Sequence, residues 1–93
     1  MVIACGGFES NAEMRARYLG PGWELAKVRG TPYNTGDGIN MALEIGASSY
    51  GNWSGSHAVQ WDYNAPEFGD LTVGDNFQKH SYPWGILVNA TGR

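Results

Sequence analysis

Few side chains in this sequence are of the types that carry out acid–base or metal chemistry. His57 and His80 are the two histidines, and the residues around them offer no cysteine and no regular carboxylate spacing. A zinc site needs several such ligands at short spacings, so we expect no metal site. His57 stands in the stretch SGSHAV and could act as a general acid or donate a hydrogen bond to a carboxylate substrate. The alternative is a structural or solvent-facing role, which is the more common one for a lone histidine.

Cys5 is the single cysteine and follows the apolar stretch VIA. A thiol in that position usually packs as a small hydrophobe, so we expect burial rather than nucleophilic reactivity. A single cysteine excludes an intrachain disulfide and is typical of a reducing compartment. No apolar run approaches the about 18 residues of a membrane span and no secretion leader is recognisable, so we expect a cytoplasmic protein without membrane association.

Asp37 stands between two glycines in the stretch TGDG, at the expected start of a helix. A helix start presents free N–H groups and the positive end of the helix dipole, and flanking glycines let a ligand approach the backbone. The other interpretation is plain capping, in which Asp37 only stabilises the first turn. From these residues alone capping is favoured, and both interpretations stay open.

Two helices and several short strands are expected to position these residues. Ser10 and Glu13 have capping-box spacing and predict a helix that runs to Leu19, where the stretch GPG stops it. The second helix has Thr35 as a candidate N-cap and Gly46 as its C-terminal glycine. These elements predict an α+β fold with two short helices and three or four short strands. The strands are expected at residues 2–4, 58–61, 71–73 and 86–88, the first of them followed by the turn at Gly6 and Gly7.

Aromatic residues are concentrated in the irregular part of the chain, between residues 53 and 84. They could line a groove for a sugar or a peptide, which would make the chain a small non-catalytic binding module, although such spacing more often closes an interface. The net charge of −3 and the scattered lysines and arginines offer no basic stripe, so we expect no nucleic-acid partner. The aromatic series comprises Trp53, Trp61, Tyr63, Phe68, Phe77, Tyr82 and Trp84.

Four stretches, taken in order, resemble the middle of a known enzyme family. They are VIACGGFESN, NTGDGINMALEIGA, a histidine in a glycine–serine setting, and GILVNATGR. Their order and approximate spacing are similar to those of FAD-dependent flavoproteins of the fumarate reductase/succinate dehydrogenase superfamily. The stretch RARYLGPGWELAKVRGTPYNTGDG is especially similar to the tricarballylate dehydrogenase branch. The resemblance covers essentially the whole chain and implies an FAD-dependent oxidoreductase that acts on a carboxylic acid.

The resemblance implies a cofactor site and a substrate site. In the family, the Gly-Gly turn lies against the dinucleotide and the aspartate of TGDG contacts the flavin, whereas threonine is usual where this chain has Cys5. His57 matches by position a histidine that binds the substrate carboxylate, although HAV stands here in place of the common HPT. The family's further substrate-binding pair is replaced by the stretch VGDNFQKH, which offers Asp75, Asn76, Gln78 and His80. The implied FAD contacts are Cys5, Gly6, Gly7, Thr35, Gly36 and Asp37, and the implied substrate contacts are His57 and Gln78.

The resemblance also implies that this chain is the central part of a larger flavoprotein. The family's G-x-G-x-x-G turn, which holds the pyrophosphate, is absent, and Arg93 is not the family's catalytic arginine. Residues 1–47 would belong to an FAD-binding α/β domain and residues 48–93 to a capping, substrate-binding domain. We expect the chain to contribute FAD and substrate contacts, to be inactive alone, and to associate with the remainder of the flavoprotein or with a second copy.

Overall fold

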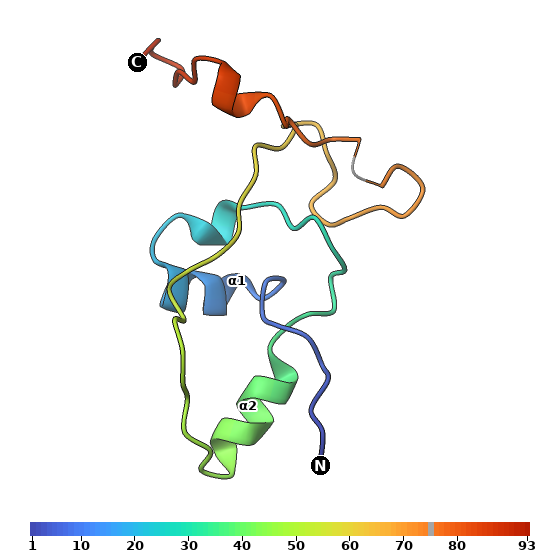
Figure 1. Ribbon diagram of the computed structural model, residues 1–93, viewed down its shortest axis with the longest axis vertical. Coiled ribbons are helices and arrows are strands. Elements are labelled where there is room, and N and C mark those ends of the chain that lie inside the picture. Colours follow the sequence, from blue (N-terminus) through green and yellow to red (C-terminus); the bar gives the residue numbers. More distant parts are fainter. Residues whose placement is uncertain (75) are drawn as a thin grey trace.

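The computed structural model describes residues 1–74 and 76–93, and its regular elements are helices and helical turns (Figure 1). Helix α1 (Ala12–Met14) continues as a π-helix over Arg15–Leu19, and a 3₁₀ turn follows at Trp23–Leu25. Helix α2 covers Asp37–Glu44, and a last 3₁₀ turn covers Tyr82–Trp84. Within the described residues, none of these helices is long and apolar enough to cross a lipid bilayer.

Helix α1 begins one residue later than the capping-box spacing predicts. Asn11, not Ser10, is the N-cap, and its side-chain oxygen accepts a hydrogen bond from the Met14 N–H at 3.1 Å. Asparagine caps a helix as well as serine does, so the cap can shift without loss. The Ser10 hydroxyl instead donates to the carbonyl oxygen of Thr31, which ties the helix start to a distant loop. The helical stretch ends as expected at Gly20, whose φ of 111° no other residue adopts easily.

Helix α2 forms where the sequence predicts a helix, with a different N-cap. Gly36 (φ 85°), not Thr35, is the N-cap, and no side chain caps the first turn. At the other end, the N–H of Gly46 (φ 90°) donates to the carbonyl oxygen of Leu43 at 3.0 Å. The N–H of Ala47 donates to the carbonyl oxygen of Ala42, also at 3.0 Å. This pair of bonds is a Schellman motif, so the predicted terminating role of Gly46 agrees with the structure.

The predicted α+β fold with three or four strands is wrong, because the described residues contain no strand and no sheet. Within them, one isolated antiparallel bridge joins Trp61 to Gln78. A strand is stable only when a neighbour takes up its backbone N–H and C=O groups. Residues 2–4 and 86–88 are apolar enough for strands, but they lie at opposite ends of the molecule and cannot pair (Figure 1). Residues 71–73 form a turn.

The buried core is small and lies around α1 and the loop that follows the first 3₁₀ turn. Among the described residues, the buried apolar ones are Met14, Val28 and Ala65, and the charged Arg15 is buried with them. The radius of gyration is 15.7 Å, whereas a compact domain of this length would have about 12 Å. The chain is therefore open in shape, and few contacts stabilise it.

Candidate functional site

The turn at Gly6 and Gly7 lies directly against the start of α2. The N–H of Gly36 donates to the carbonyl oxygen of Gly7 at 3.0 Å. A side-chain carbon placed on Gly38 would lie 2.7 Å from the Cγ2 atom of Ile3 and 3.0 Å from the Cβ atom of Cys5, so the N-terminal segment packs on the first turn of α2. The structure thus brings together the residues for which flavin contacts are predicted, which are Cys5, Gly6, Gly7, Thr35, Gly36 and Asp37.

Two of these glycines make room for the chain itself. A Cβ atom on Gly6 (φ 73°) would lie 2.5 Å from the side-chain oxygen of Asn34, and one on Gly36 would lie 2.6 Å from the sulfur of Met14. Close packing within the chain therefore requires both glycines, whether or not a ligand approaches. A Cβ atom on Gly7 would likewise lie 2.9 Å from a carboxylate oxygen of Glu9, and Gly7 also borders a large open groove.

The start of α2 exposes groups that can bind a polar cofactor. Its N-cap residue, Gly36, has no side chain that could cap the first N–H groups, and a helix start carries a partial positive charge. Asp37 is exposed, and its carboxylate accepts a hydrogen bond from the Thr35 hydroxyl at 3.1 Å. Its remaining lone pairs can accept hydrogen bonds from hydroxyl groups such as those on the ribityl chain of a flavin. The residues present at this helix start therefore fit a flavin.

A groove of about 940 Å³ opens beside the start of α2. Its lining comes from residues 7–9, which begin at the second glycine of the turn, and from residues within 23–30 and 55–63. We refer to it as the groove. Ile39 in the first turn of α2 also borders it, so the groove is continuous with the predicted flavin region. Its volume lies in the range typical of small-molecule sites.

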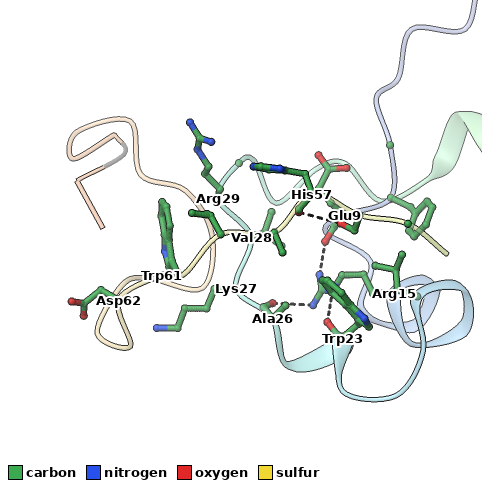
Figure 2. A pocket seen from close by; sticks show the side chains of 18 of the residues that line it. Glu9, Arg15, Trp23, Ala26, Lys27, Val28, Arg29, His57, Trp61 and Asp62 are labelled. Atoms are coloured by element: carbon green, nitrogen blue, oxygen red, sulfur yellow. Dashed lines mark hydrogen bonds between the residues drawn. The ribbon is translucent and has the colours of Figure 1, made fainter. Parts of the chain in front are cut away.

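Aromatic and apolar side chains form much of the groove surface. Val28 lies near the centre of Figure 2, with Trp61 on one side and Trp23 on the other. Val28 is buried, and its N–H donates to the carbonyl oxygen of Glu67 at 2.8 Å, which fixes the floor of the groove. The imidazole of His57 lies on the remaining side in the same view. The groove therefore combines an apolar floor and aromatic walls with a polar edge.

Arg15 lies beneath the groove and holds two of its stretches together (Figure 2). The residue is only 7% exposed. Its guanidinium donates to the backbone carbonyl oxygens of Trp23 (2.9 Å), Glu24 (3.0 Å), Ala26 (3.3 Å) and Glu9. Sequence reasoning missed this role, because an arginine in a helix carries no local signal for bonds to carbonyl groups in two loops.

The predicted substrate residues do not gather in one place. His57 lines the groove. Gln78 lies outside it, in the bridge to Trp61, and its side-chain nitrogen is buried without a hydrogen-bond partner among the described residues. Of the other candidates in this stretch, Asn76 and His80 are exposed in turns, and Asp75 lies outside the described residues.

The aromatic series between residues 53 and 84 is divided between separate clusters. The ring of Trp53 lies 4.9 Å from that of Tyr18, centroid to centroid, and so packs against the first helical stretch. The ring of Trp61 lies 6.2 Å from that of Phe77. Of the series, Trp61 and Tyr63 line the groove. The aromatic residues thus serve packing at one place and the groove wall at another.

The described residues contain no cluster of metal ligands, and the thiol of Cys5 is not buried. In the part of the chain that the structure describes, no group of three or more histidine, cysteine, aspartate or glutamate side chains lies close enough to hold a metal ion. Cys5 was predicted to be buried, but it is exposed. The thiol faces α2, since a Cβ atom on Gly38 would lie 3.2 Å from its sulfur, but this contact leaves the residue exposed, so an apolar sequence alone does not bury the thiol.

Asp62, at the rim of the groove, has a pKa below the ordinary value of an aspartate. Lys79 holds the carboxylate at 2.9 Å, and the N–H of Asn64 donates to it at 2.9 Å. The ionised form therefore contributes stability at neutral pH, and that contribution is lost as the pH falls from the ordinary pKa through the lowered one. We expect Lys79→Gln to raise the pKa of Asp62, measured by NMR titration of its carboxyl carbon. An unchanged pKa would show that the lysine contributes nothing.

Two curated proteins resemble the whole of this chain. Both are named 3-oxosteroid 1-dehydrogenase, from the H37Rv and Oshkosh strains of Mycobacterium tuberculosis, and each is 42% identical to the chain over 93 residues. The chain spans 16% and 15% of their lengths. No protein-family model and no solved structure matches the chain.

This similarity supports the resemblance to FAD-dependent flavoproteins but not the resemblance to one branch of them. 3-Oxosteroid 1-dehydrogenase is an FAD-dependent flavoprotein of the same oxidoreductase superfamily, which agrees with the predicted cofactor. The relation to the tricarballylate dehydrogenase branch is not confirmed. A carboxylic acid substrate is not supported, because the name of the relatives describes an enzyme that acts on a 3-oxosteroid.

Proposed function

We propose that this chain is part of an FAD-dependent oxidoreductase that removes hydrogen from a 3-oxosteroid or a similar neutral ring ketone. The identity of 42% across the whole chain carries this proposal. Because the similarity runs over all 93 residues, it includes both the Gly6–Gly7 turn and the TGDG stretch. These are the two elements that the fold places in contact.

In this proposal, residues 1–47 belong to the FAD-binding domain and residues 48–93 to the substrate-binding domain. The predicted flavin contacts all fall in the first range and gather at the start of α2. His57 falls in the second range and lines the groove. The apolar side chains exposed at residues 1–3 and 86–88 would then contact the rest of the enzyme.

Bound FAD would supply the acceptor for the hydrogen and its electrons. The chain's own part is to hold and orient the cofactor and the substrate. The uncapped N–H groups of α2 would donate to polar groups of the cofactor, and Asp37 would accept from its hydroxyl groups. The aromatic walls of the groove would exclude water from the substrate beside it.

A neutral substrate suits the charges of the groove better than a carboxylic acid does. Arg15, Lys27 and Arg29 line the groove, and the first two already donate to backbone carbonyl groups: Arg15 as described above, and Lys27 to the carbonyl oxygens of Tyr63 and Ala65. A carboxylate brought against the apolar floor at Val28 would lose its hydration, which is costly without new partners.

Flavin binding by the enzyme that contains this chain tests the proposal. Titration of FAD with that enzyme, freed of its cofactor, is expected to quench flavin fluorescence. Asp37→Ala is expected to raise the dissociation constant about tenfold, because a hydrogen bond to a charged group contributes about 1.5–3 kcal/mol. Glu44→Ala is the matched control, since this exposed carboxylate lies at the opposite end of the same helix. Absence of quenching by the wild-type enzyme, or equal effects of the two substitutions, contradicts the proposal.

A further inference from the structure

We infer that the groove holds the flat ring system of the substrate, and that Trp23 and Trp61 are the walls that determine its specificity. The inference rests on the proposed function and assigns its substrate to a particular place. Gly7 and Ile39 border both the groove and the start of α2. A ring system in the groove would therefore lie next to the predicted flavin contacts.

The ring of Trp61 and the backbone of Trp23 are held in place by contacts that do not depend on a ligand. The ring of Trp61 packs against that of Phe77 at 6.2 Å, and its backbone forms the bridge to Gln78. The backbone carbonyl of Trp23 accepts a 2.9 Å hydrogen bond from the buried Arg15. A ring that is already held in place, as that of Trp61 is, loses little conformational entropy when a ligand binds, which favours affinity.

The floor of the groove is also tied to the chain segment that follows Trp61. Val28 forms the floor, and its N–H donates to the carbonyl oxygen of Glu67 at 2.8 Å. The ammonium of Lys27 donates to the carbonyl oxygens of Tyr63 and Ala65 and lies 5.4 Å from the centroid of the Tyr63 ring. These bonds join residues 23–30 to the end of the 55–63 stretch, so the groove is built before any substrate enters.

A fused carbon skeleton with an oxygen at its edge matches this arrangement. The indole rings offer apolar surface beside the buried side chain of Val28, and covering such surface contributes about 25 cal/mol per Å². Polar side chains lie at one edge of the groove, where Figure 2 places His57 with Glu9 and Arg29. An imidazole N–H can donate to a ketone oxygen without requiring a charge on the ligand. Steroids with a 3-oxo group have this combination of features.

Equilibrium binding of testosterone, which is a 3-oxosteroid, to the enzyme that contains this chain, in the presence of FAD, tests the inference. Trp23→Ala and Trp61→Ala are each expected to raise the dissociation constant about tenfold, since a buried aromatic contact contributes on the order of 1–2 kcal/mol. Trp84→Ala is the control, because this tryptophan is 92% exposed and does not line the groove. Tricarballylate is expected not to displace testosterone.

The indole N–H signals of the wild-type enzyme give a second readout that does not depend on variant folding. Testosterone is expected to shift the NMR signals of Trp23 and Trp61 and to leave that of Trp84 unchanged. The inference would be overturned if testosterone shifted neither the Trp23 signal nor the Trp61 signal, or if tricarballylate displaced testosterone. Flavin fluorescence is recorded on the same samples: FAD binding without testosterone binding overturns this inference alone, whereas testosterone binding without FAD binding overturns the proposed function alone.

Discussion

Replacing Arg15 by methionine is expected to lower the free energy of unfolding by about 3 kcal/mol. Methionine fills much of the space but donates no hydrogen bond, so the carbonyl groups of Glu9, Trp23, Glu24 and Ala26 all lose the guanidinium. A buried acceptor left without a partner costs about 1–3 kcal/mol, and acceptors near the surface regain water. Because the buried core is small, a loss of this size is expected to unfold a large share of the molecules.

Arg17→Met is the matched control for this prediction. Arg17 lies on the same helical stretch, its side chain is 59% exposed, and it pairs with Glu13 at the surface. Exposed ion pairs of this kind contribute about 0–1 kcal/mol. Urea unfolding followed by circular dichroism measures both variants, and hydrogen exchange at the Val28 amide reports on the loop that Arg15 holds. Equal destabilisation by the two substitutions would show that the buried hydrogen bonds are not important.

Arg15→Met is also expected to change the groove, because Arg15 donates hydrogen bonds to two of the stretches that form it. Without the guanidinium, the main chain at Trp23 and Ala26 has no fixed distance to the turn at Glu9. The wall at Trp23 would then move relative to the floor at Val28. Testosterone binding is therefore expected to weaken in Arg15→Met even under conditions where the chain remains folded.

The two helices could be predicted from the sequence because their signals are local. The Gly46 terminus depends on residues within one turn, and the first helix needs only a polar cap followed by good helix formers. The strands could not be predicted in this way, because a strand needs a partner that may be anywhere in the chain. The apolar residues at 2–4 and 86–88 satisfy the pattern of a strand and still find no neighbour.

In the candidate site, too, some features could be predicted from the sequence and others could not. The resemblance implies FAD contacts at both the Gly6–Gly7 turn and the TGDG stretch, and the hydrogen bond between Gly36 and Gly7 shows that the two lie side by side. The groove could not be expected, because residues 23–30 and 55–63 have no periodic pattern. Their positions depend on Arg15 and Lys27, whose bonds to backbone carbonyl groups leave no trace in residue type.

Replacing Gly36 by alanine is expected to destabilise the chain by about 3 kcal/mol, from two separate causes. Its φ of 85° costs a residue with a side chain about 1–2 kcal/mol. The new methyl group would also lie 2.6 Å from the sulfur of Met14 and 3.1 Å from the Cβ atom of Phe8. Met14 is 2% exposed, so it has little room to move, and overpacking of this kind costs about 1–3 kcal/mol.

Gly22→Ala separates these two causes. Gly22 has a similar φ of 95°, but a methyl group there would meet no atom within 4 Å, so only the backbone cost applies. Thermal unfolding of both variants is expected to show the larger loss of stability at Gly36, and equal losses would mean that Met14 moves aside.

The crowded methyl group would also separate the start of α2 from the carbonyl oxygen of Gly7, which lies 3.0 Å from the Gly36 nitrogen. Gly36→Ala is therefore expected to weaken FAD binding, whereas Gly22→Ala, far from this contact in the sequence, leaves it unchanged.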